Sequence, residues 1–181
     1  MLYYERNLPH WQPETRDLFL TWRLYGSLPQ AVLNALRTRS FPSPGRKFIA
    51  FEDNLDLAAF GPTWLRTPEV AQTVVQTILD AEQCKLCRLH AYVVMPNHVH
   101  VLLEPLAQLS SITQFIKGRS ARHANLLLHR QGKTFWQKES FDHWVRGSKE
   151  FDRILLYIRN NPVKAKLAAN PDAWPWLMPK T

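Results

Sequence analysis

Cysteine is scarce in this chain of 181 residues, which contains only Cys84 and Cys87. Two cysteines cannot form a disulfide framework, and a bridge between these two would close a very short loop, so we expect reduced thiols. Apolar runs long enough to span a membrane are absent, and residues 1–6 lack the apolar segment of a signal peptide. These absences predict a cytoplasmic protein with no membrane partner.

Acidic residues are scarce in one third of the chain. The formal net charge is +8, and residues 111–166 contain 12 Lys or Arg against 4 Asp or Glu. The rest of the chain contains 11 residues of each sign, so the basic third carries the whole excess. Aromatic residues are interleaved with these cations, a composition suited to binding phosphates and stacking bases. A solvated basic face has the same composition, so charge alone indicates a polyanion without identifying it.

Two histidines stand two residues apart in the otherwise apolar segment 91–103. Side chains alternate between the faces of a β-strand, so His98 and His100 are expected on the same face as Leu102. Imidazole is a common metal ligand, and two rings on one face can share an ion. The segment therefore predicts a metal site on one face of a strand.

Hydrophobic periodicity predicts an alternation of strands and helices. The predicted strands are residues 18–25, 89–95, 98–104 and 141–145, and the predicted helices are residues 29–37, 68–82 and 111–130 and a last helix capped by Ser148. Thr67 is the expected N-cap of the second helix, and residues 111–114 fit a capping box. Pro96 and Asn97 supply a tight turn, so the second and third strands should form a β-hairpin. This order of elements resembles an α+β ferredoxin-like sandwich, an antiparallel sheet covered by helices.

The length suits one domain, which we expect to comprise residues 1–181. Residues 39–67 are rich in proline and glycine and are expected to form a loop-rich insertion, with a short helix around residues 55–60. Residues 167–181 are expected to form a short C-terminal tail. The sequence assigns no function to the insertion or to the tail.

The last predicted helix has polar residues along one side. Residues recurring there every three or four positions are Arg153, Tyr157, Asn161 and Lys164. A tyrosine is thereby flanked by two cations and followed one turn later by an amide. Pro162 disfavours helical geometry at the preceding residue, so we expect the helix to end or bend there.

Three segments together resemble a known family. Residues 94–100, 135–143 and 157–164 are similar to those of the REP-associated tyrosine transposases, which belong to the one-tyrosine HUH class of single-strand DNA transposases. The similarity extends from residue 5 to residue 166 and is weakest over residues 39–67. A His-x-His pair is common, but its combination with a downstream Tyr-x-x-x-Asn-Pro is far more specific. The resemblance implies a ferredoxin-like fold of the HUH endonuclease type.

The resemblance also implies roles for individual residues. His98 and His100 match the metal-binding pair, and Asn161 falls where relatives place a third polar ligand. Tyr157 matches the catalytic nucleophile. The implied cofactor is a divalent metal, Mg or Mn, and the implied reaction is nicking and strand transfer through a covalent 5′-phosphotyrosine.

The implied substrate is single-stranded DNA carrying REP-type hairpins. We expect a monomer, with a homodimer as the alternative, associated with the nucleoid when DNA is bound. The basic residues expected to contact DNA are Lys117, Arg119, Arg122, Arg146, Arg153 and Lys164. Of these, Arg153 and Lys164 are also candidates to favour ionisation of Tyr157, and no general base is identified.

Two alternatives stay open at this point. The first is a protein that binds structured single-stranded DNA without cutting it. The second is a nucleic-acid-binding module with a structural zinc, whose ligands would be Cys84, Cys87, His98 and His100. A metal nuclease with clustered carboxylates is disfavoured, because few acids lie between the histidines and Tyr157.

Overall fold

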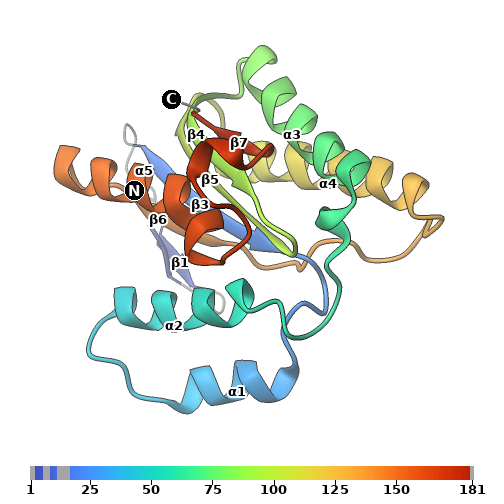
Figure 1. Ribbon diagram of the computed structural model, residues 1–181. Helices are drawn as coiled ribbons and strands as arrows, with labels where there is room; N and C mark the ends of the chain where they lie inside the picture. Colours follow the sequence, from blue (N-terminus) through green and yellow to red (C-terminus); the bar gives the residue numbers. More distant parts are fainter. Residues whose placement is uncertain (1–2, 6–8, 12–16, 180–181) are drawn as a thin grey trace.

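A five-stranded antiparallel sheet with strand order β6-β3-β5-β4-β7 forms the centre of the protein (Figure 1). The computed structural model describes residues 3–5, 9–11 and 17–179. The strands of this sheet are β3 (Leu18–Arg23), β4 (Cys87–Val94), β5 (His98–Pro105), β6 (Phe141–Trp144) and β7 (Leu177–Met178). A separate two-stranded sheet pairs β1 (Tyr3–Glu5) with β2 (Pro9–Trp11).

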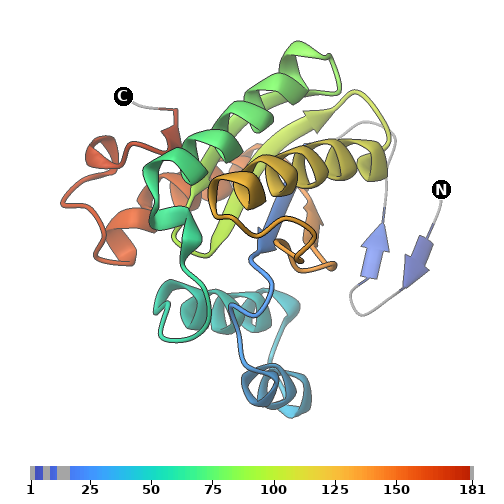
Figure 2. The same cartoon turned by 90° about the vertical axis from the view of Figure 1, so that its right-hand side faces the viewer.

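Helices cover both faces of the large sheet. The helices are α1 (Gln30–Thr38), α2 (Pro44–Asp56), α3 (Pro68–Gln83), α4 (Leu109–Leu127) and α5 (Ser148–Lys164), with 3₁₀ turns η1 (Trp64–Arg66) and η2 (Pro171–Ala173). Figure 2 shows α3 and α4 side by side over one face. Helix α5 covers the other face, and α1 and α2 lie together beyond one end of the sheet (Figure 1). The predicted α+β fold with a helix-covered antiparallel sheet is confirmed.

The two faces of β5 have different surroundings, as the alternation of its side chains predicts. Val101 and Leu103 belong to the larger core cluster under α3 and α4. Leu102 belongs to the smaller cluster under α5. His98 and His100 share its face and are fully buried. The hairpin thus directs both imidazoles toward α5.

A β-bulge in β4 lies between Leu89 and Ala91. A bulge inserts one residue into a strand and so exchanges the faces of the residues beyond it. Cys87 packs in the larger core before the bulge, whereas Ala91 packs in the α5-side cluster after it. The bulge therefore sets Cys87 on the face opposite to the histidines.

Residues 39–67 contain a full helix instead of an extended loop. Helix α2 begins after Ser43, whose hydroxyl accepts a hydrogen bond from a backbone N–H of the first turn, and Pro44 occupies its first position. Proline is favoured at that position because its missing N–H has no intrahelical partner there. The prediction of a short helix at residues 55–60 is wrong, because the proline and glycine that indicate a loop in the sequence here start a longer helix.

Helix ends also differ from the prediction. No capping box starts α4, which begins at Leu109 after Gln108. Helix α5 begins at Ser148 itself, after Gly147. It continues through Pro162 to Lys164, because a proline in the last turn removes only one intrahelical hydrogen bond. This continuation keeps Asn161 and Lys164 on the helix.

The described part of the C-terminal tail joins the sheet. Leu177 pairs with Val93 in β7, and the Trp174 indole Nε1 donates to the backbone oxygen of Val94 at 3.0 Å. Among the residues that the structure describes, no helix is long and apolar enough to cross a membrane.

Replacement of Leu103 by alanine tests the larger core. Leu103 is 0% exposed, and removal of its buried methylenes should lower the free energy of unfolding by about 2–5 kcal/mol. Leu156→Ala removes the same group at a position that is 57% exposed and should change that free energy by less than about 0.5 kcal/mol. Urea denaturation followed by circular dichroism measures both, and equal losses would contradict the assigned core.

Candidate active site

The imidazoles of His98 and His100 are oriented by neighbours at their Nδ1 atoms. Asn97 Nδ2 donates to the backbone oxygen of Leu55 at 3.0 Å, so its Oδ1 faces His98 Nδ1 at 2.7 Å. An amide oxygen only accepts, so His98 Nδ1 carries the proton and Nε2 keeps its lone pair. Thr21 Oγ1 lies 2.8 Å from His100 Nδ1, and the two Nε2 atoms are 3.1 Å apart. Both Nε2 atoms can therefore serve one metal ion.

A carboxylate from α2 joins the histidine pair. Glu52 is fully buried, and its Oε2 lies 2.9 Å from His100 Nε2 and 3.8 Å from His98 Nε2. The potential ligand atoms of these three residues all lie within 4.8 Å of one another. In the described part of the chain, this is the sole cluster of three or more His, Cys, Asp or Glu residues with ligand spacing.

Helix α5 brings a phenol and an amide to the same cluster. The Tyr157 hydroxyl donates to Glu52 Oε2 at 3.0 Å, and its ring meets the His100 ring at 5.4 Å between centroids. Asn161, one turn later, is buried with its Nδ2 at 3.4 Å from His100 Nε2. The structure thus brings together the four residues that the resemblance singled out.

Burial controls the protonation of the cluster. Desolvation lowers the pKa of both His98 and His100 to about 3, so the rings are neutral and able to bind a metal. Desolvation raises the pKa of Glu52 to about 7, although the nearby His98 and the Tyr157 hydrogen bond oppose that shift. Desolvation, followed by the charges of Glu52 and Asp56, raises the pKa of Tyr157 well above its usual value of 10. The phenol is therefore protonated in this arrangement.

Lys164 joins α5 to α2 beside the cluster. Its Nζ lies 2.8 Å from Asp53 Oδ1 and 3.0 Å from Asp56 Oδ2. The Nζ also lies 6.0 Å from the centre of the Tyr157 ring. Partial burial lowers the pKa of Lys164, but the hydrogen bonds to the two aspartates outweigh it and the net pKa is raised. A positive charge is thus held close to the tyrosine.

The other predicted DNA contacts lie outside the cluster. Arg119, Arg122, Arg146 and Arg153 are all exposed. Arg119 and Arg122 lie on α4, which covers the face of the sheet opposite to Tyr157. Arg153 has a side chain that is 75% exposed and lies 3.8 Å from Glu150. Their contact with DNA stays a prediction.

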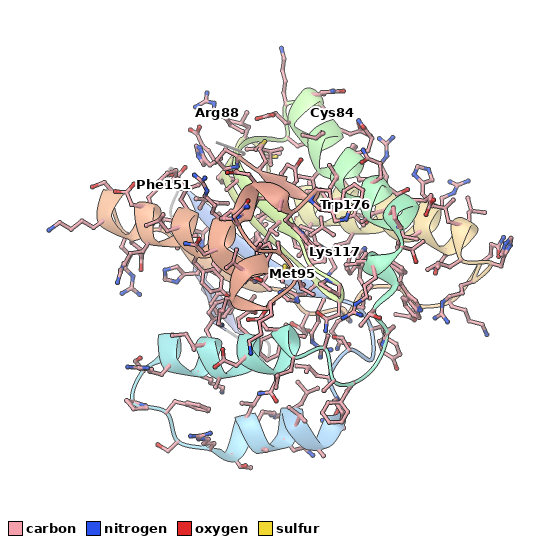
Figure 3. All side chains as sticks on the ribbon, viewed as in Figure 1. Cys84, Arg88, Met95, Lys117, Phe151 and Trp176 are labelled. Carbon is pink, nitrogen blue, oxygen red and sulfur yellow. The ribbon has the colours of Figure 1, made fainter. Side chains whose placement is uncertain are left out.

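Lys117, labelled in Figure 3, contacts other parts of the protein through its ammonium group. Its Nζ donates to the backbone oxygens of Gln137 and Lys138 and to Ser140 Oγ, at 2.9, 3.0 and 3.0 Å. Burial lowers the pKa of this ammonium to about 8. Lys117 therefore anchors the segment 137–140, and a DNA contact by the same group stays an untested prediction.

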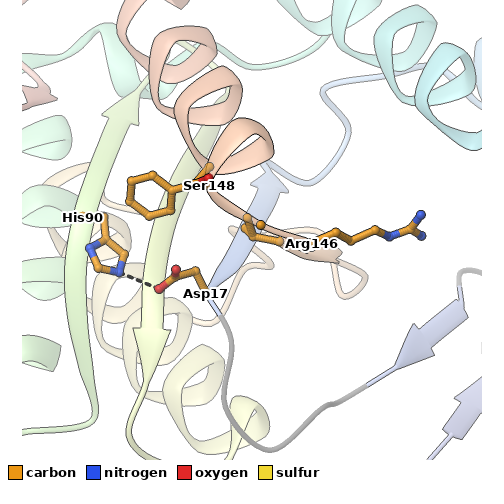
Figure 4. Close-up of a pocket in the computed structure, with 7 residues that line it drawn as sticks. Asp17, His90, Arg146 and Ser148 are labelled. Atoms are coloured by element: carbon orange, nitrogen blue, oxygen red, sulfur yellow. Dashed lines mark hydrogen bonds and ion pairs between the residues drawn. The ribbon is translucent and has the colours of Figure 1, made fainter.

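A separate hollow of about 610 Å³ lies at the start of α5 (Figure 4). It is lined by Asp17, His90, Val145, Arg146, Gly147, Ser148 and Phe151. His90 Nε2 lies 2.7 Å from Asp17 Oδ1, and the Arg146 side chain extends away from that pair. The hollow shares none of its lining residues with the histidine cluster.

The structural zinc alternative is excluded by the position of the cysteines. Cys87 pairs with Pro105, five residues along β5 from His100, which corresponds to about 17 Å. Cys87 also packs on the other face of the sheet, and Cys84 is exposed at the end of α3. Ligands of one zinc ion lie only about 2.0–2.3 Å from the metal, so these residues cannot share it with the histidines.

The sequence prediction does not include Glu52, because its proline and glycine content makes the segment 39–67 appear loop-rich. A signal was present. Phe48, Glu52 and Leu55 follow the spacing i, i+4, i+7, so a helix there places one carboxylate in an otherwise apolar stripe. A charged residue on the buried side of a helix needs a partner, and this would have marked it as a site candidate.

The part of the chain that matches a known protein family contains most residues of this cluster. Residues 63–161 match the family described as transposase IS200 like. The chain belongs to this family. His98, His100, Tyr157 and Asn161 all fall within the matched region, whereas Glu52 lies outside it.

Two known proteins are similar to this family member. A REP-associated tyrosine transposase of Escherichia coli (strain K12) is 27% identical over 108 residues, which are 58% of this chain and 62% of that protein. The match thus spans less than two thirds of the relative. The structure of a REP-associated tyrosine transposase bound to a REP hairpin has a TM-score of 0.62 and 20% identity, covering 98% of this chain and 82% of that one. The resemblance to these transposases is confirmed, and the structural match supports the shared fold.

Replacement of Lys117 by methionine tests its anchoring role. Loss of the three hydrogen bonds leaves the part-buried Gln137 carbonyl and Ser140 hydroxyl, and the exposed Lys138 carbonyl, without their donor, so the free energy of unfolding should fall by about 1–3 kcal/mol. Arg122→Met removes an exposed cation from the same helix and should change stability by less than about 0.5 kcal/mol. Chemical denaturation compares the two variants, and an unchanged midpoint for Lys117→Met would reject the anchor.

Proposed function

We propose that this protein nicks and rejoins single-stranded DNA at REP-type hairpins through a covalent 5′-phosphotyrosine on Tyr157. The observation that carries the proposal is the convergence of the Tyr157 hydroxyl, the two histidine Nε2 atoms and Asn161 in one buried cluster. Membership of the IS200-like transposase family supports the reaction class. The hairpin-bound relative supports the choice of substrate.

The donors of the cluster fit a divalent metal. Asn161 Oδ1 and Glu52 Oε1 are buried and have no hydrogen-bond partner among the described residues, and such atoms call for an ion or a water. Neutral imidazoles and amide oxygen suit Mn, and Mg accepts oxygen ligands. In this proposal His98, His100 and Asn161 hold the ion, which would polarise the scissile phosphodiester when bound.

The protein's own groups position the nucleophile. Glu52 accepts the hydrogen bond of Tyr157 and so fixes the direction of the hydroxyl. The ammonium of Lys164 lies near the ring and can offset negative charge that develops as the phenolic oxygen attacks. The oxygen loses its proton and forms a bond to phosphorus while the bond from phosphorus to the 3′ oxygen breaks. The 3′ oxygen takes up a proton and leaves as the free 3′-hydroxyl, and the phosphoester energy is kept for rejoining.

The same proposal includes the partners. Arg119, Arg122, Arg146 and Arg153 are exposed cations that can contact the sugar-phosphate backbone. We propose a monomer as the acting species, with a homodimer as the alternative, at the nucleoid in the cytoplasm.

Replacement of Tyr157 by phenylalanine tests the reaction. Incubation with a labelled hairpin oligonucleotide and Mn²⁺ should give the wild-type protein a covalent DNA adduct that survives denaturing electrophoresis. Tyr157→Phe lacks the attacking oxygen, so the adduct should be lost while hairpin affinity changes by less than about threefold. Tyr25→Phe removes a hydroxyl from a side chain that is 55% exposed and should retain the adduct.

Two outcomes would reject the proposed reaction. An adduct formed by Tyr157→Phe would assign the nucleophile to another residue. Tight hairpin binding by the wild type with no adduct in Mn²⁺ or Mg²⁺ would favour the non-cutting binding protein.

The salt dependence of hairpin binding tests the exposed arginines. Each phosphate contact on single-stranded nucleic acid contributes about 0.7 to the slope of log affinity against log salt. Arg119→Gln, Arg122→Gln and Arg146→Gln should each reduce that slope with little effect on sequence preference. Arg39→Gln, an exposed cation at the end of α1, serves as the control. If none of the three variants changes the slope, the proposed contacts between these arginines and the DNA backbone are wrong.

A further inference from the structure

Glu52 is a buried carboxylate whose contacts carry no formal positive charge. Its side chain is 0% exposed, and its Oε2 contacts the neutral His100 ring and the Tyr157 hydroxyl at 2.9 and 3.0 Å. Its Oε1 has no hydrogen-bond partner in the part of the chain that the structure describes. The nearby ammonium of Lys164 is bound to Asp53 and Asp56 instead. Burial of an ionised carboxylate is costly unless a cation compensates it. Among the described residues, the Lys164 ammonium acts on Glu52 only from a distance, and no cationic side chain is in direct contact with Glu52.

The spacing of the donor atoms fits one small cation. Ligand atoms at about 2.0–2.2 Å from a shared ion lie no more than about 4.4 Å from one another. The distances between the two Nε2 atoms and from each to Glu52 Oε2 are 3.1, 2.9 and 3.8 Å. All three distances lie below that limit.

We propose that Glu52 is the carboxylate ligand of the same cation, which adds one carboxylate to the two imidazoles and the Asn161 amide. The inference rests on the proposed function, since it uses the same histidine pair. It adds a residue from α2, a helix outside the part of the chain that matches the transposase family. Two neutral imidazoles, one amide oxygen and one carboxylate leave further positions of a six-coordinate ion open for phosphate oxygen or water.

The proposal also connects the metal to the nucleophile. A carboxylate oxygen has two lone pairs, so one oxygen can bind a cation and also accept a hydrogen bond. Glu52 Oε2, which lies 2.9 Å from His100 Nε2, also accepts the Tyr157 hydroxyl. One side chain would then set the position of the phenol relative to the ion, so Glu52 acts as both ligand and positioning residue.

Asp56 is a nearby carboxylate that fits the site less well. One of its oxygens lies 3.8 Å from His98 Nε2, but the side chain is paired with Lys164 at 3.0 Å. Asp53, next to Glu52 in the sequence, is exposed and pairs with the same lysine. The three acids of α2 therefore differ in role, and they supply matched variants for a test.

Titration of the full chain with Mn²⁺ in the absence of DNA tests the ligand directly. Electron paramagnetic resonance of free Mn²⁺ gives the dissociation constant without any measurement of activity. We expect one Mn²⁺ per wild-type chain, loss of binding in His98→Ala, and an at least tenfold weaker dissociation constant in Glu52→Gln. Asp53→Asn and Asp56→Asn should each stay within about threefold of the wild type.

Stability provides a second measurement. A ligand that binds only the folded protein raises its melting temperature. Mn²⁺ should therefore raise the melting temperature of the wild type and of Asp53→Asn more than that of Glu52→Gln. If Glu52→Gln does not fold, Glu52→Asp replaces it in the test. This variant keeps the carboxylate on a side chain shorter by one methylene, and it should bind Mn²⁺ more weakly than the wild type.

The outcomes separate this inference from the proposed function. Wild-type Mn²⁺ affinity in Glu52→Gln, together with loss in His98→Ala, would overturn the role of Glu52 and leave the transposase proposal intact. Loss of affinity in Asp56→Asn alone would assign the carboxylate to Asp56 and also overturn the inference. Formation of the DNA adduct by the wild type in EDTA, with no Mn²⁺ bound, would overturn the metal site as a whole.

Discussion

The contact on which the site depends is the close approach of two neutral imidazole Nε2 atoms and a carboxylate oxygen in a space from which water is excluded. Three polar atoms so close together would be unfavourable in an apolar core without compensation. Thr21 and Asn97 compensate the outer ring nitrogens, but the inner atoms face one another. Desolvation keeps His98 and His100 neutral, so the same burial that is costly to the fold prepares both rings for a cation.

Three elements far apart in the sequence supply this cluster, and the contacts that attach each of them to the rest of the protein differ in strength. The sheet fixes the histidines through the ladder between β3 and β5. Helix α5 is seated on the sheet by apolar residues such as Ile158, which is fully buried. Helix α2 is attached by Phe48, by the bond from Asn97 to the backbone of Leu55, and by the ion pairs of Lys164. The Lys164–Asp53 pair is exposed, and exposed ion pairs contribute only about 0–1 kcal/mol each. A bound cation would therefore stabilise the position of α2 more than that of the sheet or of α5.

The basic third of the chain is divided by the fold. Its cations lie on both sides of the sheet, since α4 carries Arg119 and Arg122 over one face while α5 carries Lys164 beside the tyrosine. The Lys117 ammonium donates hydrogen bonds to backbone carbonyls of the protein itself. A count of charges therefore overstated the surface offered to a polyanion, because composition does not report direction.

Local periodicity allowed much of this protein to be predicted from its sequence. Alternation along β5 determined that His98 and His100 share a face, and the helical repeat determined that Tyr157 and Asn161 lie one turn apart, since both depend only on neighbouring residues. Tertiary structure alone decided that α2 folds back to bring Glu52 to the histidines. It also decided that a bulge and the length of β5 keep Cys87 away from them. Such contacts depend on packing between residues distant in sequence, and no local pattern encodes the position of one element relative to another.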